Sequence, residues 1–377
     1  MGSIFIGLMS GTSLDGIDGV VVDFSATGGS PRAQVLAHAK RGFSSDLRTR
    51  LAALNRSGDD EIHRAAIAAN ALARDYAALA ETLRASAAVA TQPIIAIGCH
   101  GQTVRHRPGE FDGTGYTVQL NAPALLAELT GIDVIADFRS RDVAAGGQGA
   151  PLVPAFHRAV FGRADATVAV LNLGGIANLT VLGPGTQAIG FDCGPANTLL
   201  DLWCQRSAGQ AFDKGGTIAA HGVVDPRLLD ALLAEPYFAL EPPKSTGLDL
   251  FNAPWLDARL DAADARTRLR PEDVQATLAQ LTADVVAAAV RRHAGAAGEL
   301  VVCGGGAFNA DLMKRLERGL APIVVVPSDA RGLPVDQVEA AAFAWLAHAF
   351  VARQPGNVPS ATGAAGPRVL GALYPAR

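Results

Sequence analysis

Two glycine-rich turns, far apart along the chain, hold residue types that suit phosphate binding. The first turn lies between two apolar segments and consists of Ser10, Gly11, Thr12, Ser13, Leu14, Asp15, Gly16, Ile17 and Asp18. Its glycines allow backbone N–H groups to approach an anion closely, and its hydroxyl side chains are further donors. Asp15 or Asp18 could hold Mg²⁺ through water, because this ion accepts carboxylate ligands. An ordinary hairpin turn is the alternative for this segment.

The second turn consists of Asn172, Leu173, Gly174, Gly175, Ile176, Ala177 and Asn178. A hairpin alone would again explain it. Both turns together, each next to an apolar segment, favour a polyphosphate bound from two sides. This predicts a two-lobed, nucleotide-dependent enzyme with a cleft.

A third glycine cluster, Gly304, Gly305 and Gly306, follows the apolar segment 300–303. It permits close approach to an adenine or a ribose, and tight strand–helix packing is the alternative.

A single aspartate stands between the second turn and the helix expected from Asn197. Asp192 follows the expected strand 189–191, and ligands of open α/β sheets bind at the carboxyl ends of strands. Its carboxylate could deprotonate a hydroxyl or a water, whereas a helix cap or a turn is the structural alternative. The neighbouring Cys193 has no base beside it in the sequence, so a buried thiol is expected there.

Polar residues also follow the buried strand expected over 94–98, namely His100, Gln102 and Thr103. His100 could act as a base, and a hydrogen-bonded structural histidine is the alternative. Further along, Arg139 and Arg141 suit a carboxylate or a phosphate, although an exposed charged loop would give the same pattern. These residues are the candidates for contacts to an anionic substrate.

Apolar periodicity predicts the elements that position these residues. Strands are expected over 3–9, 17–24, 94–98, 117–120, 132–135, 168–173, 189–191 and 299–303. Helices are expected on either side of Gly58 within 45–90, and over 123–130, 153–161, 272–293, 309–316 and 339–353. A first lobe over 1–145, joined by part of the tail, a second lobe over 146–340, and a C-terminal helix and tail over 341–377 are the expected domains.

Composition limits the classes of partner. The chain has 377 residues, of which 49% are hydrophobic and 18% charged, so it can bury sizeable cores. The formal net charge of −4 gives no basic excess for nucleic acid or an anionic membrane. No apolar run reaches membrane-spanning length and no secretory signal is found, which predicts a cytoplasmic protein. The cysteines, Cys99, Cys193, Cys204 and Cys303, lack zinc-site spacing and are expected to be free and buried.

Several of these motifs together resemble a known family. Paired phosphate turns, an aspartate after the second turn and a late glycine cluster look like the superfold of actin, heat-shock chaperone ATPases and sugar kinases. Within it, the chain most resembles the anhydro-N-acetylmuramic acid kinases, over 9–18, 101–103, 121–123, 136–139, 146–154, 191–195, 243–247, 303–306 and 371–375. The resemblance implies an α/β protein with a two-lobed actin-like ATPase fold. Each lobe is expected to be a mixed sheet flanked by helices, with a cleft between the lobes.

The resemblance also implies an activity. The family hydrolyses the 1,6-anhydro bridge of 1,6-anhydro-N-acetylmuramic acid and phosphorylates O6 with ATP and Mg²⁺, giving N-acetylmuramic acid 6-phosphate in peptidoglycan recycling. Asp192 matches the general base. The residues assigned to ATP are Gly11, Thr12, Ser13, Leu14, Asp15, Gly16, Ile17, Asp18, Asn172, Gly174, Gly175, Gly304, Gly305 and Gly306. Those assigned to the sugar are His100, Gln102, Thr103, Arg139 and Arg141.

One departure from the family pattern is Ala196, which stands where a second glycine is expected after Pro195. Its methyl group could narrow the turn slightly. Three other functions stay open at this point: an ordinary sugar kinase acting on a free hydroxyl, a nucleotide switch like actin or a chaperone, and a sugar sensor without catalysis. A homodimer is one option for the assembly.

Overall fold

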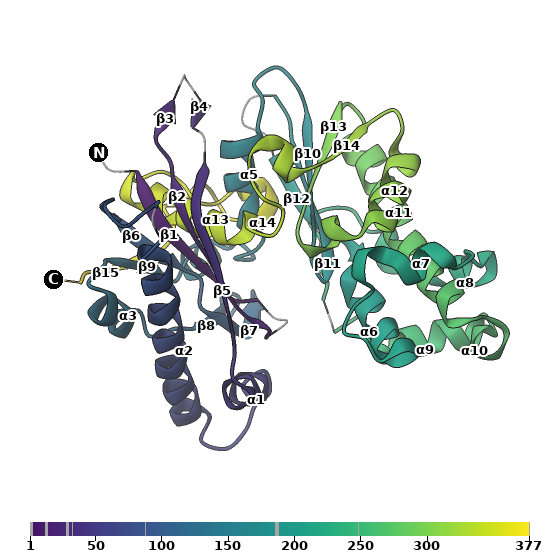
Figure 1. Ribbon diagram of the computed structural model, residues 1–377, viewed down its shortest axis with the longest axis horizontal. Helices are drawn as coiled ribbons and strands as arrows, with labels where there is room; N and C mark the ends of the chain where they lie inside the picture. The colour runs from purple at the N-terminus through teal and green to yellow at the C-terminus, as the bar shows by residue number, and fades with distance from the viewer. Residues whose placement is uncertain are drawn as a thin grey trace. The chain divides into compact units, whose positions relative to one another are not determined.

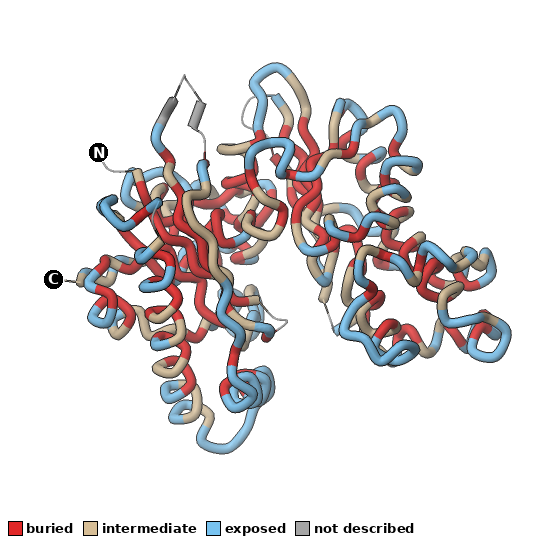
Figure 2. Tube along the Cα trace, viewed as in Figure 1, coloured by how far each residue is buried: buried red, intermediate tan, exposed pale blue. Residues whose placement is uncertain are grey.

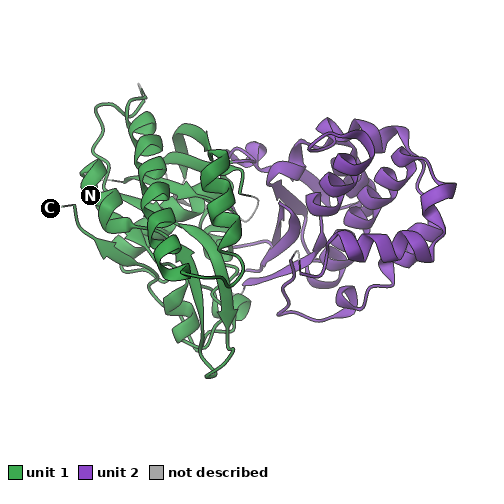
Figure 3. Ribbon diagram, turned by 90° about the horizontal axis from the view of Figure 1, so that it is seen from below, with its two compact units in different colours: residues 1–160, 337–377 green, residues 161–336 purple. Residues whose placement is uncertain are grey.

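The structure is a computed structural model that describes residues 3–11, 14–27, 30–31, 33–86, 88–184, 188–247 and 249–376. The chain divides into two compact units (Figure 3). Unit 1 combines residues 1–160 with residues 337–377, and unit 2 consists of residues 161–336. Unit 1 is therefore built from both ends of the chain.

Unit 1 contains a mixed sheet with the strand order β15-β9-β6-β1-β2-β5 (Figure 1). Its strands are β1 Ile4–Met9, β2 Gly16–Asp23, β5 Gln34–Gly42, β6 Ala96–Cys99, β9 Val134–Ala136 and β15 Ala372–Tyr374. Two short antiparallel pairs accompany it: β3 Ala26–Thr27 with β4 Ser30–Pro31, and β7 Gln102–Pro108 with β8 Gly115–Leu120. Because β1 pairs antiparallel with β2 and parallel with β6, the first glycine-rich turn and the residues after β6 leave neighbouring strands.

Helices flank this sheet. They are α1 Ser45–Ala53, α2 Glu61–Arg84, α3 Pro123–Thr130, α4 Ser140–Ala144, α5 Val153–Phe161, α13 Val338–Val351 and α14 Pro359–Thr362. A Cβ atom on Gly7 of β1 would clash with the carbonyl oxygen of Ala340 in α13, so glycine is what lets this helix pack closely on the sheet. The next residue, Leu8, points to the opposite face, because side chains alternate along a strand.

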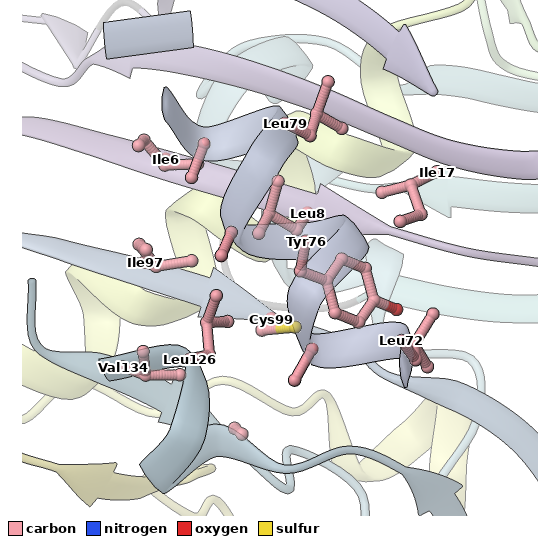
Figure 4. Packing of buried hydrophobic residues seen from close by; sticks show 14 of the residues in the cluster. Ile6, Leu8, Ile17, Leu72, Tyr76, Leu79, Ile97, Cys99, Leu126 and Val134 are labelled. Atoms are coloured by element: carbon pink, nitrogen blue, oxygen red, sulfur yellow. The ribbon is translucent and has the colours of Figure 1, made fainter. Parts of the chain in front are cut away.

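The hydrophobic core of unit 1 joins that opposite face of the sheet to α2 (Figure 4). Leu8 and Ile97 of the sheet and Leu72 and Leu79 of α2 are all buried in it. Tyr76 of α2 is also fully buried, and its hydroxyl lies 2.7 Å from the Oγ of Ser10. The core therefore holds the first glycine-rich turn at its start.

Unit 2 contains a second mixed sheet, with the strand order β12-β11-β10-β13-β14. Its strands are β10 Val168–Leu173, β11 Ile176–Leu182, β12 Ala188–Pro195, β13 Glu299–Cys303 and β14 Val324–Pro327. β10 pairs antiparallel with β11 and parallel with β13, as β1 pairs with β2 and β6 in unit 1. The two glycine-rich turns thus occupy equivalent places in the two units.

The helices of unit 2 are α6 Asn197–Ala208, α7 Thr217–His221, α8 Pro226–Leu233, α9 Ala253–Ala262, α10 Ala265–Arg268, α11 Pro271–His293 and α12 Ala310–Leu320. Short 3-10 helices cover Lys214–Gly216, Pro236–Ala239, Gly305–Phe308 and Ser328–Arg331. α11 has a buried residue at most of its positions (Figure 2). One cluster of core residues includes its Val286 and Val290, and another cluster includes its Val274 and Leu278. This helix therefore joins the sheet to the helical part of unit 2.

Most expected elements are confirmed, including the two hairpins, the two helices around Gly58, and the long helix α11. The α/β class, with a mixed sheet flanked by helices in each unit, is confirmed as well. Strand β7 was not predicted, because its polar residues do not show the apolar pattern that is typical of a strand. The C-terminal tail is more ordered than expected, since it contains α14 and β15. β15 is three residues long and depends on pairing with the distant strand β9.

The four cysteines, Cys99, Cys193, Cys204 and Cys303, are free and buried, as expected. Within the described parts of the chain, no helix combines the length and the apolar character that crossing a membrane requires.

Candidate active site

Asp192 lies in β12 and is held from two sides. Asn178 of β11 donates a hydrogen bond from Nδ2 to Asp192 Oδ1 at 2.9 Å, and the two residues are paired across the strands. On the other side, the backbone N–H of Thr246 donates to Asp192 Oδ2 at 3.0 Å. Each oxygen of the half-buried carboxylate thus has a donor, which fixes the direction in which it can accept a proton.

The pKa of Asp192 is raised above the ordinary value of an aspartate, because burial disfavours the charged form. The hydrogen bonds from Asn178 and Thr246, together with the charge of Lys244, lower the pKa but do not overcome the burial. A base is most effective when its pKa lies near the working pH. The shift therefore suits Asp192 to general-base catalysis better than an exposed aspartate.

The segment that carries Thr246 is itself tied to β12. The backbone N–H of Asp192 donates to the carbonyl oxygen of Lys244 at 3.2 Å, and the Tyr237 hydroxyl donates to the carbonyl oxygen of Asp192 at 2.9 Å. The Nζ of Lys244 donates to the carbonyl oxygen of Tyr237 at 3.2 Å and lies 4.8 Å from the centre of its ring. These contacts fix Thr246 next to the carboxylate.

Residues 244–247 were expected only as part of the family-like segment 243–247, with no role of their own, and Asn178 was expected only as part of the second turn. The contact of Asn178 with Asp192 depends on the strand register, which shifts between Ala177 and Asn178. The contact of Thr246 crosses 54 residues of the chain. No pattern of neighbouring residues in the sequence predicts either contact.

Cys193, the neighbour of Asp192, is buried, and both burial and the nearby Asp192 raise its pKa far above the ordinary value of a thiol. A thiol that stays protonated is a poor nucleophile. The residue therefore packs in the core of unit 2, in agreement with the expectation from the sequence.

The second glycine-rich turn presents backbone N–H groups. The carbonyl oxygens of Leu173, Gly174 and Gly175 accept hydrogen bonds from the first residues of α6 and the residue before it, at 2.9 to 3.1 Å. In a trans peptide the N–H points away from the preceding carbonyl oxygen. The N–H groups of Gly174 and Gly175 therefore face away from α6, as a bound anion would require.

Ala196 takes part in this arrangement, since its N–H donates to the carbonyl oxygen of Gly175 at 2.9 Å. Its backbone φ angle is −121°, so no left-handed conformation is required there.

The third glycine cluster lies against the second turn. Gly304 has a φ angle of +83°, and a Cβ there would clash with Oδ1 of Asn172. A Cβ on Gly306 would lie 2.6 Å from Cβ of Leu173. Tight packing thus accounts for these two glycines. Gly305 differs, because it is exposed and a Cβ there would meet no atom within 4 Å, which leaves room for a ligand.

In unit 1, the first turn contains Gly11, Leu14, Asp15, Gly16, Ile17 and Asp18, while Thr12 and Ser13 lie outside the described residues. The N–H of Leu14 donates to the carbonyl oxygen of Gly11 at 3.3 Å, which closes the turn. The side chains of Leu14 and Ile17 are buried in the core, so only their backbones could contact a nucleotide. Gly16 is required by the close approach of the Arg41 carbonyl oxygen.

His100 and Arg139 form a chain of hydrogen bonds beside this turn. The Nδ1–H of His100 donates to the carbonyl oxygen of Ser10 at 3.3 Å, and Arg139 Nε donates to His100 Nε2 at 3.1 Å. Burial, together with the nearby Arg139 charge, lowers the pKa of His100 to about 3. With a neutral ring and both nitrogens engaged, His100 positions Arg139 and is unsuited to be a base.

Arg139 is a half-buried cation that His100 and Gly149 hold in place. Its Nη1 donates to the carbonyl oxygen of Gly149 at 2.7 Å and its Nε contacts His100. Burial lowers the pKa of Arg139 to about 10, with the charges of Glu339 and Asp142 acting in the opposite direction, so the group stays charged at neutral pH. Its remaining nitrogen, Nη2, suits an anionic substrate group.

The other sugar-site candidates of unit 1 lie in different surroundings. Gln102 is buried and donates from Nε2 to the carbonyl oxygen of Gly11 at 3.0 Å, so it contacts the first turn. Thr103 accepts from Gln119 across the β7–β8 pair at 3.2 Å. Arg141 is exposed and is not part of the His100–Arg139 chain. The structure thus brings Gln102, His100 and Arg139 toward the first turn, but not Arg141.

In the described residues, Asp15 and Asp18 do not form a preformed metal site. Asp15 is exposed, and Asp18 lies 3.3 Å from the Nζ of Lys40. Among the residues that the structure describes, no group of three or more His, Cys, Asp or Glu side chains is placed to hold a metal ion.

The family model described as anhydro-N-acetylmuramic acid kinase matches residues 3–376. The chain belongs to this family. Among its relatives, the anhydro-N-acetylmuramic acid kinase of Bordetella petrii is 60% identical over 376 residues, which cover 100% of this chain and 97% of that protein. The one of Variovorax paradoxus is 58% identical over 380 residues, which cover 100% of both chains. Membership in the anhydro-N-acetylmuramic acid kinase family makes the chain a kinase and leaves the switch and the sensor without support.

Two solved structures are also similar. The activator of the 2-hydroxyisocaproyl-CoA dehydratase from Clostridium difficile, with bound ADPNP, has a TM-score of 0.45 at 12% identity and covers 90% of this chain and 92% of its own. A ROK family glucokinase from Streptomyces griseus, in complex with glucose and AMPPNP, has a TM-score of 0.40 at 13% identity, covering 91% and 98%.

Proposed function

We propose that this kinase uses ATP and water to convert 1,6-anhydro-N-acetylmuramic acid, the anhydro sugar, into N-acetylmuramic acid 6-phosphate. Asp192 is the general base. The observation that carries the proposal is the placement of this carboxylate, held by Asn178 and Thr246 and with a raised pKa, in a chain that matches the kinase family over residues 3–376.

The reaction needs two bond changes at O6. Asp192 takes a proton from a water molecule, whose oxygen attacks the anomeric carbon C1 of the anhydro sugar. The bond between C1 and O6 breaks, and its electron pair stays on O6. O6 then attacks the γ-phosphorus of ATP and ADP leaves, while the proton on Asp192 passes to solvent. Anhydro sugar, water and ATP thus give sugar 6-phosphate, ADP and a proton.

The glycine-rich turns hold the nucleotide in this proposal. The N–H groups of Gly174 and Gly175 and those of the first turn donate to phosphate oxygens, which stabilises the developing charge. Gly305 leaves room for the adenosine. Asp15 would contact Mg²⁺ through water, and the ion would supply neutralisation of the phosphate charge.

Arg139 binds the lactyl carboxylate of the anhydro sugar through Nη2, because a fixed guanidinium is the natural partner of a carboxylate. His100 and Gln102 support this contact by holding Arg139 and the first turn, and Thr103 lies on the same strand as Gln102. Arg141, which is exposed, contributes only if the sugar reaches it.

The test is incubation of the enzyme with MgATP and the anhydro sugar in ¹⁸O-labelled water, followed by mass analysis of the product. The expected product carries one added phosphoryl group and one solvent oxygen at C1. N-acetylmuramic acid 6-phosphate kept in the same water measures the background exchange at C1. A phosphorylated product that keeps the anhydro bridge and contains no ¹⁸O would contradict the proposal and favour an ordinary sugar kinase.

A further inference from the structure

Two buried polar atoms beside Asp192 have no hydrogen-bond partner among the described residues. They are Oδ1 of Asn178 and Oγ1 of Thr246. Both belong to residues that already donate to Asp192, Asn178 through Nδ2 at 2.9 Å and Thr246 through its backbone N–H at 3.0 Å. The two donors contact different oxygens of the carboxylate. The unpaired atoms therefore stand on both sides of the same group.

An unpaired buried polar atom costs free energy, and folded proteins contain few of them. The surrounding groups are paired: the Tyr237 hydroxyl donates to the Asp192 carbonyl oxygen, and the Lys244 Nζ donates to two carbonyl oxygens. Other buried atoms without a partner occur elsewhere in the described residues, but among Asn178, Thr246, Tyr237 and Lys244 they are these two atoms next to the proposed base. This is the pattern expected of groups that wait for a ligand.

We infer that Thr246 Oγ1 and Asn178 Oδ1, together with the Asp192 carboxylate, form the binding site of the attacking water. This inference rests on the proposed function, because it assumes that water is the nucleophile at C1. It assigns Thr246 and Asn178 to the reaction as residues that contact the water itself.

The hydrogen bonds of such a water can be counted. A water molecule has two protons and two lone pairs. One proton goes to the Asp192 carboxylate and the other to Asn178 Oδ1, which is an acceptor only. The Thr246 hydroxyl donates to one lone pair. The second lone pair is left free to attack C1, and Asp192 receives the proton as the new bond forms.

The test is the variant T246V, which replaces the hydroxyl by a methyl group of similar size and keeps the backbone N–H that contacts Asp192. We expect kcat to fall about 10- to 100-fold, because a misplaced reactant costs about that much. The KM for ATP should stay unchanged. The melting temperature should stay the same or rise, since an unpaired buried hydroxyl has been removed. T246S, which restores the hydroxyl, should recover most of kcat.

A matched control is T277V in α11. Thr277 is also buried, but its hydroxyl donates to the carbonyl oxygen of Asp273 at 2.7 Å and accepts from the N–H of Asp225 at 3.0 Å. This variant should lower the melting temperature and leave kcat unchanged. T246V should lower kcat without lowering the melting temperature, whereas T277V should lower the melting temperature without lowering kcat. This contrast separates a hydroxyl that acts in the reaction from one that stabilises the fold.

Wild-type kcat in T246V would overturn the inference. A raised KM for the anhydro sugar with an unchanged kcat would also overturn it, because Thr246 would then bind the sugar and not the water. T246A removes the same hydroxyl with a smaller side chain and replaces T246V if the latter does not fold. Failure of the wild-type enzyme to put ¹⁸O at C1 is a separate result, since it contradicts the proposed function itself.

Discussion

Two aspartates, one in each unit, show how differently a protein can use a carboxylate. Asp142 in unit 1 is completely buried and accepts three hydrogen bonds, from Gly149 N at 2.8 Å, Asn357 Nδ2 at 2.6 Å and Thr362 Oγ1 at 2.8 Å. Asp192 in unit 2 is half-buried and accepts two, beside atoms that lack partners.

The difference teaches how to tell a structural carboxylate from a reactive one. The donors to Asp142 come from its own loop and from the C-terminal segment, so the group joins two parts of the chain that are more than 200 residues apart. An ionised carboxylate has about four acceptor sites, and Asp142 uses most of them. Asp192 keeps capacity for a proton, which a base requires and a structural group does not.

The largest effect is expected from D192N. An amide cannot accept the proton, so turnover should fall about 10²- to 10⁴-fold, the usual contribution of general-base catalysis. Nucleotide affinity should stay close to the wild type, because in the proposed function Asp192 contacts the water and not the nucleotide. Steady-state kinetics with the anhydro sugar and a nucleotide binding titration measure both. Full activity of D192N would remove Asp192 from the mechanism.

The second effect concerns stability and comes from D142N. The carboxylate of Asp142 accepts hydrogen bonds from the surrounding donors. An amide NH₂ group in this buried position would place another donor opposite them. We expect a loss of about 2 to 3 kcal/mol in the free energy of unfolding, since hydrogen bonds to a charged group are lost and a donor is left unpaired. Denaturant unfolding measures it. A variant as stable as the wild type would show that Asp142 does not hold the C-terminal segment.

A third effect is expected at Arg139, whose loop Asp142 holds through Gly149. R139A should raise the KM for the anhydro sugar about tenfold or more, because a charge-assisted contact to the lactyl carboxylate is lost. Its KM for ATP should change little. R107A, which removes an exposed arginine of β7, is the control for the change in net charge. Equal KM values for the anhydro sugar in R139A and R107A would show that Arg139 does not bind the lactyl carboxylate.

The smallest effect is the pH shift of N178L, a variant whose kcat should also fall because a contact to the attacking water is lost. Asp192 must be ionised to act, so kcat/KM falls as the pH drops below its raised pKa. Loss of the Asn178 hydrogen bond, which lowers that pKa, should move the acid limb of the profile to higher pH. T246V keeps its N–H and should leave the limb in place. An unshifted limb in N178L would assign the acid limb to another group.

The sequence was sufficient to single out the glycine-rich turns and Asp192 as candidates, because these features are local. Glycine before and after an apolar strand, and an aspartate at a strand end, are visible within a few residues. It was not sufficient for Asn178, Thr246 and Asp142. Their roles depend on a register shift between β11 and β12, on a contact across 54 residues and on the return of the C-terminal segment.

The sequence by itself determined the family, many of the strands and helices, and the residue types available for chemistry, since these follow from hydrophobic periodicity and short motifs. Only the tertiary structure decided which polar groups are paired. Burial sets the pKa of Asp192 and of His100, and burial is a property of the packed chain. Two aspartates that look alike in the sequence therefore become a structural group in unit 1 and the proposed base in unit 2.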